Sequence, residues 1–420
     1  MKVLLLGADG FIGRHVAFFL RGQGVEVIAC ARCVSRLEQM GFATLRADLG
    51  DPQTHDPAFW RSRLAGGVHV VNCAGLLTGP ETAFRTVHIC APKAVLAARD
   101  GGHLVHISAV GIDHADTPFA QWRREGEARL TGQSNVTVLR PGLVLGETSY
   151  GGSSALRAFA ALPFLRPVVG TGTQPFNPVH ASDLATVIFE CLSTPPGFGP
   201  YDIGGPETLS QSQLGAMYRR WLGLRAVPEL CLPSPVARVL GRLGDWLALG
   251  PISSTAVAQL DAGVLADPTD LLQAISKRPR SATAFIAARP AGTQDLWHAR
   301  LYLLKPLTRL VLAVMWLGSG VVGLMAPMMA VIATVPSLPA AIAMPLARSG
   351  GVVDPAIGVA LLTNWQPKAT AIAQFLVVAG YTLGLSILSP GLWLDPIGGM
   401  LKNLPVLALL LIHLALVDER

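Results

Sequence analysis

The residues near the N-terminus with the clearest chemical signature are three glycines in the run from Gly7 to Gly13. The run follows the apolar segment MKVLLL and precedes the helix-like segment HVAFFL. Glycines at this spacing let the chain turn tightly, let backbone N–H groups approach a pyrophosphate and let a helix pack on a strand. A glycine-rich turn without a ligand is the simpler alternative, but the strand-to-helix context favours a dinucleotide site. The predicted cofactor-binding residues here are Gly7, Gly10, Phe11, Ile12 and Gly13.

Two arginines bear on the choice of dinucleotide. An acidic residue at the end of the second strand would bind the ribose 2′-hydroxyl of NAD, but Val27 to Cys30 lead into Ala31 and Arg32 with no acid. Arg14 follows the third glycine. A guanidinium suits a 2′-phosphate, so NADP(H) is favoured and NAD(H) remains possible. The alternative is that Arg14 and Arg32 are solvated surface charges.

Short apolar runs alternate with helical patterns through residues 1–225, which predicts an α/β fold with a Rossmann doubly wound parallel sheet. An amphipathic helix is expected at Ala91–Arg99. Residues 226–300 contain several prolines and amphipathic stretches, which predict a helical linker or lid. Residues 301–420 form a third, apolar part. The expected strands are Val3–Leu6, Val25–Ala29, Val68–Asn72, His103–Ser108 and Val136–Leu139.

Ordered motifs along residues 1–225 resemble those of the extended and atypical short-chain dehydrogenase/reductases. The nearest branch is the NAD(P)-binding group that includes the nucleotide-binding accessory subunit of complex I. The resemblance implies that Asp48 contacts adenine and that Ala74 and Gly75 line the cofactor. It also implies that Arg140 to Gly142 follow the strand beside the nicotinamide, and that His180 and Asp183 lie on the substrate side. The matching pieces are Asp48 in RADLGDP, VVNCAG, HISAVG, LRPGLVLG, FNPVHASDLA and YDIGGPETLS.

Active members of that superfamily use a serine followed by Tyr-x-x-x-Lys, in which the tyrosine exchanges a proton while hydride moves. Ser108 matches the serine, but Phe119 stands at the tyrosine position and Arg123 at the lysine position. Phenylalanine has no titratable proton, and arginine barely changes its protonation. The resemblance therefore implies an impaired mechanism, unless the alignment has slipped. No other Tyr-x-x-x-Lys occurs in the chain.

The C-terminal part predicts an all-α transmembrane helical bundle. About 20 apolar residues cross a bilayer as a helix, and residues 310–347 and 369–394 carry no charge. The prolines in 327–346 predict a re-entrant or interfacial segment. Asp354 and Lys402, each beside a turn signal, are expected at the interface, although an intramembrane charge is often functional. This part resembles the DoxX-like membrane family. Spans are expected near 307–326, 350–366, 369–389 and 401–417.

The composition argues against a soluble protein, a nucleic-acid-binding protein and a metal-binding protein. A mean hydropathy of +0.45 with 14% charged residues is high for a soluble protein. No Lys/Arg block stands out in a net charge of +6, so no nucleic-acid partner is expected. Cys30 and Cys33 make a C-x-x-C, but no second Cys/His pair at zinc spacing follows, so no metal site is expected. The six cysteines fit a reducing compartment.

Two hypotheses follow. The first is a membrane-anchored NAD(P)H-dependent oxidoreductase acting on a lipophilic substrate such as a quinone or isoprenoid. The second is a non-catalytic cofactor-binding subunit that stabilises or regulates a membrane redox complex. No signal peptide precedes the first strand. We therefore expect a multi-pass protein of the inner, cytoplasmic membrane with its Rossmann domain and both termini in the cytoplasm.

Overall fold

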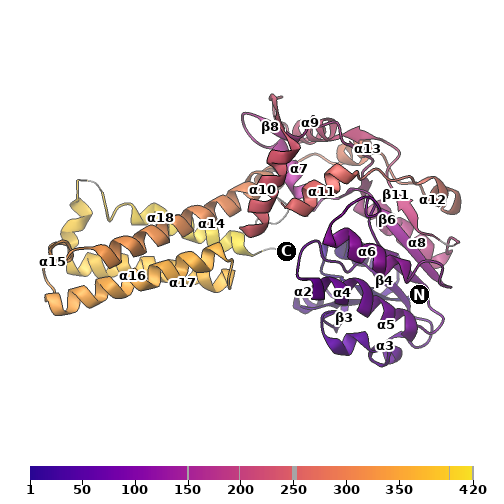
Figure 1. Cartoon of the computed structure of the whole chain (residues 1–420), viewed down its shortest axis with the longest axis horizontal. Helices are drawn as coiled ribbons and strands as arrows, with labels where there is room; N and C mark the ends of the chain where they lie inside the picture. The colour runs from indigo at the N-terminus through magenta and orange to yellow at the C-terminus, as the bar shows by residue number, and fades with distance from the viewer. Residues whose placement is uncertain (149–150, 198, 248–252, 397, 419–420) are drawn as a thin grey trace. The chain divides into compact units, whose positions relative to one another are not determined.

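The computed structural model describes residues 1–148, 151–197, 199–247, 253–396 and 398–418 (Figure 1). The chain divides into two compact units. The first contains Met1–Asp245 and Gly250–Ala299, and the second contains Trp246–Leu249 and Arg300–Arg420.

The first unit is built on a seven-stranded sheet with the order β3-β2-β1-β4-β5-β6-β11, in which every pairing is parallel. The chain starts in the middle of the sheet and winds outward in both directions, so the predicted doubly wound Rossmann sheet is confirmed. Strands β3 and β11 were not among the expected strands. The bounds are β1 Lys2–Leu6, β2 Glu26–Ala31, β3 Ala43–Arg46, β4 His69–Asn72, β5 Leu104–Ile107, β6 Val136–Pro141 and β11 Tyr201–Ile203.

Alternating side chains of the strands fill two cores, one on each face of the sheet. Val3 and Leu5 point to a core shared with α1 and α8, whereas Leu4 and Leu6 point to a core shared with α3 and α5. Because both faces are buried, the strands read as continuous apolar runs. The helices beside the sheet are α1 Phe11–Gly22, α2 Ser35–Gln39, α3 Pro57–Leu64, α4 Glu81–Arg85, α5 Ala91–Ala98, α6 Pro118–Ala128 and α8 Ala181–Ser193, with a π-helical turn, η2, at Thr86–Cys90 and a 3₁₀ turn, η1, at Pro52–His55.

A smaller lobe follows β6 and has its own core, which contains Leu145, Leu214, Tyr218 and Phe285. Three two-stranded pairs frame this lobe: β7 (Val144–Leu145) with β10 (Val179–His180), β8 (Arg166–Val169) with β13 (Glu229–Leu232), and β9 (Pro175–Phe176) with β12 (Leu209–Ser210). Its helices are α7 Gly152–Ala160, α9 Gln211–Trp221, α10 Ser234–Trp246, α11 Ser254–Ala262 and α13 Ala282–Ala287. Helix α12, Thr269–Ala274, packs instead on the core of the large sheet beside β11.

The second unit is helical. Side chains of four helices share one core, which contains Trp316, Ile357, Leu361, Val378 and Leu410. Helix α14 runs from Thr293 to Met325 and crosses into this unit from the first. The other elements are α15 Met328–Thr334, α16 Ala340–Leu362, α17 Pro367–Leu388, the 3₁₀ turn η3 Pro390–Leu394, and α18 Asn403–Val417.

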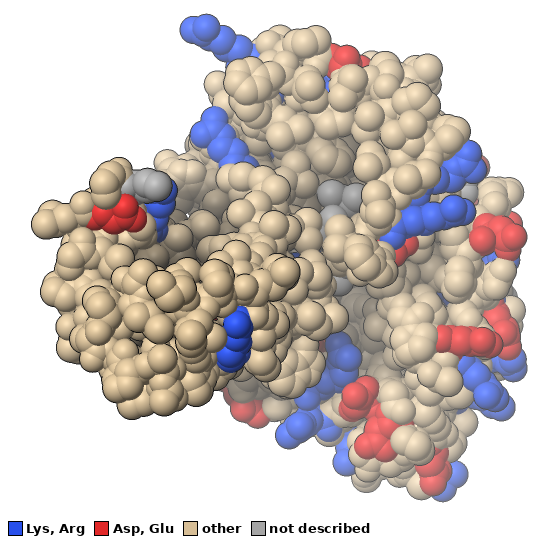
Figure 2. Space-filling model, turned by 60° about the vertical axis from the view of Figure 1, so that its left-hand side comes forward, with Lys and Arg blue, Asp and Glu red and all other residues tan. Residues whose placement is uncertain are grey.

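The outer surface of these helices is apolar. Val314, Met325, Met329 and Ile387 are 69%, 76%, 77% and 80% exposed, and the helical lobe that comes forward in Figure 2 carries few charged side chains. An exposed apolar surface of this extent is typical of contact with lipid or another protein. By length and composition, α14 and α17 could cross a membrane, and α18 is a shorter apolar helix. The four-span arrangement therefore stays a prediction.

The chain does not turn at Asp354, which lies within the second expected span. Helix α16 continues from Ala340 to Leu362 straight through Asp354 and Pro355. Asp354 is buried and accepts hydrogen bonds from Ser319 Oγ (2.6 Å) and Tyr381 Oη (3.1 Å). The expected position beside a turn is therefore wrong for Asp354. Close packing explains this, because a side chain on Gly320 would collide with Pro355, and glycines let helices approach closely.

Candidate functional site

In the turn between β1 and α1, the packing of neighbouring backbone requires glycine at two positions, whereas the third position faces solvent. Gly7 has a φ of +72°, and an ideal Cβ there would lie 2.8 Å from the backbone N of Ala74. A Cβ on Gly13 would collide with the carbonyl oxygen of Gly7. Gly10 is exposed, and a Cβ there would meet only the Gly7 oxygen, at 3.2 Å. This arrangement leaves free space at Gly10, at the N-terminus of α1, where backbone N–H groups can hold an anion.

The other predicted cofactor residues surround this turn at the carboxyl edge of the sheet. Phe11 and Ile12 are half-buried in the first turn of α1, and Arg14 is half-buried one residue after Gly13. Arg32 is exposed directly after β2. Asp48 is exposed after β3, and its Oδ1 accepts the backbone N–H of Gly50 at 2.9 Å. Ala74 and Gly75 follow β4.

Ser108 lies directly after β5, and Phe119 and Arg123 lie on α6. Neither Phe119 nor Arg123 can act as the usual proton donor. Ser108 is buried directly after β5, and its Oγ has no hydrogen-bond partner among the described residues. The ring of Phe119 packs in an apolar cluster with Phe84 and Ile112. Arg123 donates from Nη1 to the carbonyl of Ile107 at 2.5 Å, and its guanidinium lies 5.2 Å from the Phe119 ring centroid.

The titratable groups around Arg123 hold no proton that is ready to transfer at neutral pH. Burial, reinforced by the charge of Arg123, lowers the pKa of His88 to about 3 and that of His106 to about 3. Burial raises the pKa of the Cys73 thiol to about 12, and lowers the pKa of Arg123 itself to about 10. Both imidazoles are therefore neutral, and neither replaces a catalytic tyrosine as a proton donor at neutral pH.

Two further features enclose this edge of the sheet. Arg123 lies directly over Gly75, where any side chain would collide with its Nη2. The segment after α11 covers the loops that follow β5 and β6: a Cβ on Gly111 would collide with the Gly263 carbonyl, and a Cβ on Gly142 would lie 3.2 Å from the Val264 carbonyl. The approach at Gly111, where φ is +81°, requires glycine. A Cβ on Gly75 would displace the flexible end of Arg123, and one on Gly142 would require only a small shift of the Val264 carbonyl.

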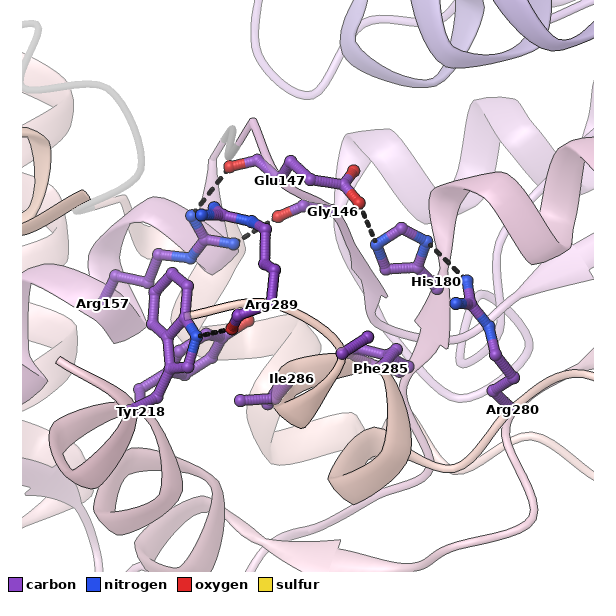
Figure 3. A pocket seen from close by; sticks show the side chains of 11 residues that line it. Gly146, Glu147, Arg157, His180, Tyr218, Arg280, Phe285, Ile286 and Arg289 are labelled. Atoms are coloured by element: carbon purple, nitrogen blue, oxygen red, sulfur yellow. Dashed lines mark hydrogen bonds and ion pairs between the residues drawn. The ribbon is translucent and has the colours of Figure 1, made fainter. Parts of the chain in front are cut away.

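A polar cavity of about 160 Å³ lies in the smaller lobe of the first unit. We call it the arginine cavity. Three guanidiniums and three aromatic rings face it, together with one carboxylate (Figure 3). Its lining residues are Gly146, Glu147, Arg157, His180, Tyr218, Trp221, Arg280, Phe285, Ile286, Ala288 and Arg289.

Hydrogen bonds fix the orientation of His180 in this cavity. Its Nδ1 accepts the backbone N–H of Ser182 at 3.2 Å, at the start of α8, so the proton is assigned to Nε2. The Nε2 lies 3.4 Å from Glu147 Oε1. Burial lowers the pKa of His180 despite the nearby Glu147 carboxylate. His180 is therefore a neutral donor to Glu147, and Asp183 lies behind it, paired with Arg280 at 2.9 Å.

Comparisons with known proteins agree with both units. Residues 313–411 match the DoxX-like family. The chain is 26% identical over 286 residues to the mitochondrial NADH dehydrogenase [ubiquinone] 1 alpha subcomplex subunit 9 of Arabidopsis thaliana, covering 61% of this chain and 67% of that protein. It is also 26% identical over 269 residues to a chloroplastic epimerase family protein SDR39U1 homolog of the same plant, covering 55% and 75%.

Among solved structures, the NADPH-dependent quinone oxidoreductase QOR2 of Escherichia coli, complexed with NADPH, is similar with a TM-score of 0.52 and 20% identity, over 69% of this chain and 99% of that chain. At this identity the likeness concerns the fold. The first unit has the Rossmann fold, and its relatives include a subunit of mitochondrial NADH dehydrogenase and an epimerase family protein. The second contains a DoxX-like domain.

Several of the residues that face these sites could not be singled out from the sequence. Arg157, Arg280 and Arg289 come from α7 and from the two sides of α13, and only the fold places them around one cavity. His88 lies in the π-helical turn η2, a distortion that often accompanies functional sites but leaves no simple sequence signal. His180 was expected on the substrate side, and it lines the cavity.

Proposed function

We propose that this chain is a membrane-attached oxidoreductase of the short-chain dehydrogenase/reductase type that binds NAD(P)H and reduces a lipophilic acceptor. The observation that carries the proposal is the combination of an open glycine turn at Gly10 with an apolar environment at Phe119. The open turn suits a dinucleotide. The environment of Phe119 restricts the acceptors that such a dinucleotide could reduce.

The residues at the turn fit a nicotinamide dinucleotide. Gly7, Gly10, Phe11, Ile12 and Gly13 would hold the pyrophosphate, because the turn presents the N-terminus of α1 without a side chain in the way. Asp48 would contact the adenine, and Ala74 and Gly75 would line the cofactor. NADPH is present in the similar quinone oxidoreductase QOR2. When bound, the nicotinamide supplies hydride.

We further propose that NADP(H) is preferred over NAD(H). Arg32 is exposed directly after β2, where an acidic residue would bind the ribose of NAD, and Arg14 is near the same turn. An exposed guanidinium is free to form a bidentate pair with a 2′-phosphate.

The absence of a proton donor at Phe119 favours a quinone as the acceptor. Reduction of a ketone or aldehyde produces an alkoxide, which is a far stronger base than a phenolate and about as basic as hydroxide. Such a step needs an acid at the reacting oxygen. Reduction of a quinone produces a phenolate, and a phenol has a pKa of about 10, so solvent can deliver the proton afterwards. Phe119 is compatible with the second reaction and unsuited to the first.

The alternative is a non-catalytic cofactor-binding subunit of a membrane redox complex. Phe119 and Arg123 also favour this, since neither can supply the usual proton transfer. The similarity to a subunit of mitochondrial NADH dehydrogenase supports it independently. In that case the dinucleotide would be structural or regulatory.

One experiment separates the two. The full-length protein, purified in detergent, is titrated with NADPH and NADH and then supplied with short-chain ubiquinone, menadione, or a panel of aldehydes and ketones. Cofactor binding with turnover of quinones but not of simple carbonyls supports the oxidoreductase. Binding without turnover of any acceptor supports the non-catalytic subunit. If neither cofactor binds, the glycine turn has been misassigned and both proposals fail.

For the membrane part, the DoxX-like match and the apolar helices α14 and α17 support membrane association. We propose four spans in the cytoplasmic membrane, with the Rossmann domain on the cytoplasmic side. Arg300 and Lys305 precede the first span, and Lys368 lies between the second and third. These positions follow the positive-inside rule.

A further inference from the structure

Arg157 lines the arginine cavity without a carboxylate partner. Its side chain is buried, and its two Nη atoms donate to the backbone carbonyls of Gly146 and Glu147. Its Nε has no partner, and across the described residues no carboxylate lies within ion-pair distance of its guanidinium. The Asp295 carboxylate interacts with Arg157 only at longer range. A buried guanidinium without a direct ion pair is costly, and an anionic ligand would relieve that cost.

The guanidinium of Arg289 lies beside that of Arg157, and both lie over the ring of Trp221. The carbon Cζ of Arg157 is 5.5 Å from the Trp221 ring centroid, and that of Arg289 is 5.0 Å from it. Trp221 Nε1 also donates to the carbonyl of Arg289 at 2.9 Å. The carboxylate of Asp295 neutralises Arg289 but does not line the cavity. Two adjacent guanidiniums on one aromatic wall suit an anion that accepts several N–H bonds.

The only carboxylate among the described lining residues is turned away from this pair. Figure 3 shows the side chain of Glu147 directed toward His180, on the other side of the cavity from Arg157. His180 is neutral and donates to Glu147, as described above. Glu147 is therefore closest to His180, although it also interacts with Arg289 at longer range. Because Asp295 balances Arg289, Arg157 leaves an excess of one positive charge at this end.

Of the remaining lining residues, Ile286 and Ala288 are apolar, and Phe285 packs against His180 with ring centroids 5.0 Å apart. The cavity volume of about 160 Å³ is below the roughly 300–1,000 Å³ of pockets that enclose a whole drug-sized ligand. It therefore has room for a head group and the first few atoms of a chain.

We propose that the arginine cavity binds the phosphate group of a ligand with an apolar chain, with the phosphate between Arg157 and Arg289. The inference concerns binding and does not depend on hydride transfer. The phosphate could belong to a separate ligand or to a dinucleotide. We commit to a separate ligand, because Ile286 and Ala288 in the lining suit an apolar chain better than a ribose.

The test uses the full-length protein in detergent and isothermal titration with inorganic phosphate, butyl phosphate and butanol. We expect butyl phosphate to bind and butanol not to bind. Butyl phosphate should bind more tightly than inorganic phosphate, by about three- to fourfold for each methylene that is buried.

Each double substitution removes an arginine together with its carboxylate partner, so the net charge of the region does not change. Arg289→Gln with Asp295→Asn removes the guanidinium at the proposed phosphate site together with its partner. Arg280→Gln with Asp183→Asn makes the same change at the His180 end. We expect at least a tenfold loss of butyl phosphate affinity in the first double variant and less than about threefold in the second, a difference of roughly 0.7 kcal/mol or more. Arg278→Gln, on the exposed surface of the same segment, should have no effect.

The titration is repeated with saturating NADPH, and each variant is checked by size-exclusion chromatography and thermal unfolding. Binding that persists beside NADPH supports a separate ligand, whereas competition by NADPH overturns the proposal, because the site then belongs to the dinucleotide. Absence of butyl phosphate binding by the folded wild type, or equal losses in the two double variants, also overturns it. If the first double variant does not fold, Arg157→Lys, which keeps the charge but loses the bidentate fork, replaces it with the same expectation.

Discussion

Gly10 and Gly13 should respond differently to the same small substitution, and this contrast tests whether the glycine turn binds a dinucleotide. Gly10 is the N-cap of α1 with φ −74° and ψ 170°, a conformation that alanine adopts without strain. Its Cβ would lie 3.2 Å from one oxygen and meet nothing else. The N-cap preference of glycine over alanine and the smaller unfolded-state entropy of alanine roughly cancel, at about 0.5–1 kcal/mol each. Gly10→Ala requires the Gly7 carbonyl to shift by a few tenths of an ångström, so it should cost much less stability than Gly13→Ala.

Gly13→Ala should instead destabilise the domain, because its Cβ would collide with the Gly7 carbonyl and approach Ala8 Cα at 3.0 Å. Overpacking of this kind costs about 1–3 kcal/mol, which corresponds to a fall of roughly 2–12 °C in the unfolding temperature of a domain of this size.

NADPH affinity should fall at least 100-fold in Gly10→Ala, or about 2.8 kcal/mol, because the methyl group would take the position of a pyrophosphate oxygen.

Fluorescence titration with NADPH and thermal unfolding of the full-length protein measure the two effects separately. Gly22→Ala is the matched control, since it lies at the end of the same helix and a Cβ there meets nothing within 4 Å. It should change neither quantity in the unfavourable direction. If Gly10→Ala binds NADPH within about threefold of the wild type, a difference of roughly 0.7 kcal/mol, the pyrophosphate does not lie against Gly10, and the assignment of the turn is refuted.

The wild type should bind NADP(H) more tightly than NAD(H), and Arg32→Asp should shift the preference toward NAD(H) by removing a phosphate partner and adding a repelling charge; equal affinities of the wild type for both cofactors would contradict this. Phe119→Tyr with Arg123→Lys should raise carbonyl-reductase activity from its baseline, because it restores a proton donor and its tuning cation; an unchanged rate with the cofactor still bound would mean that no carbonyl substrate lies there. A reporter fused after residue 420 should be active only if it functions in the cytoplasm, as four spans require. A periplasm-dependent reporter that is active in its place would overturn the four-span arrangement.

Local patterns predicted the central strands because each of these is an apolar run buried on both faces. The edge strands β3 and β11 lack that signal. Ala43–Arg46 has no fully buried residue, and Tyr201–Ile203 has only three residues. Pairing specifies both strands, through Thr44 opposite Ala29 and Asp202 opposite Arg140, so their positions depend on neighbours that are distant in sequence.

Candidate residues that lie in one continuous segment were accessible from the sequence, whereas those assembled by the fold were not. The glycine turn is local, and its spacing alone predicts its shape. The arginine cavity is assembled from separate elements, and no spacing rule connects Arg157 to Arg289. The Asp-Pro dipeptide at Asp354 illustrates the opposite failure: it is a strong local turn signal, but the close packing of Gly320 against Pro355 keeps the helix continuous.

The glycine turn and the arginine cavity share one wall. An ideal Cβ on Gly146 would lie 3.2 Å from His15 Nε2 and 3.3 Å from the ring of Phe11, so this residue packs directly against α1, the helix that begins at the glycine turn. The carbonyl of the same residue accepts a hydrogen bond from Arg157. Gly146, the residue after β7, therefore connects the first turn of α1 with Arg157, and for this reason phosphate binding has to be measured both with and without saturating NADPH.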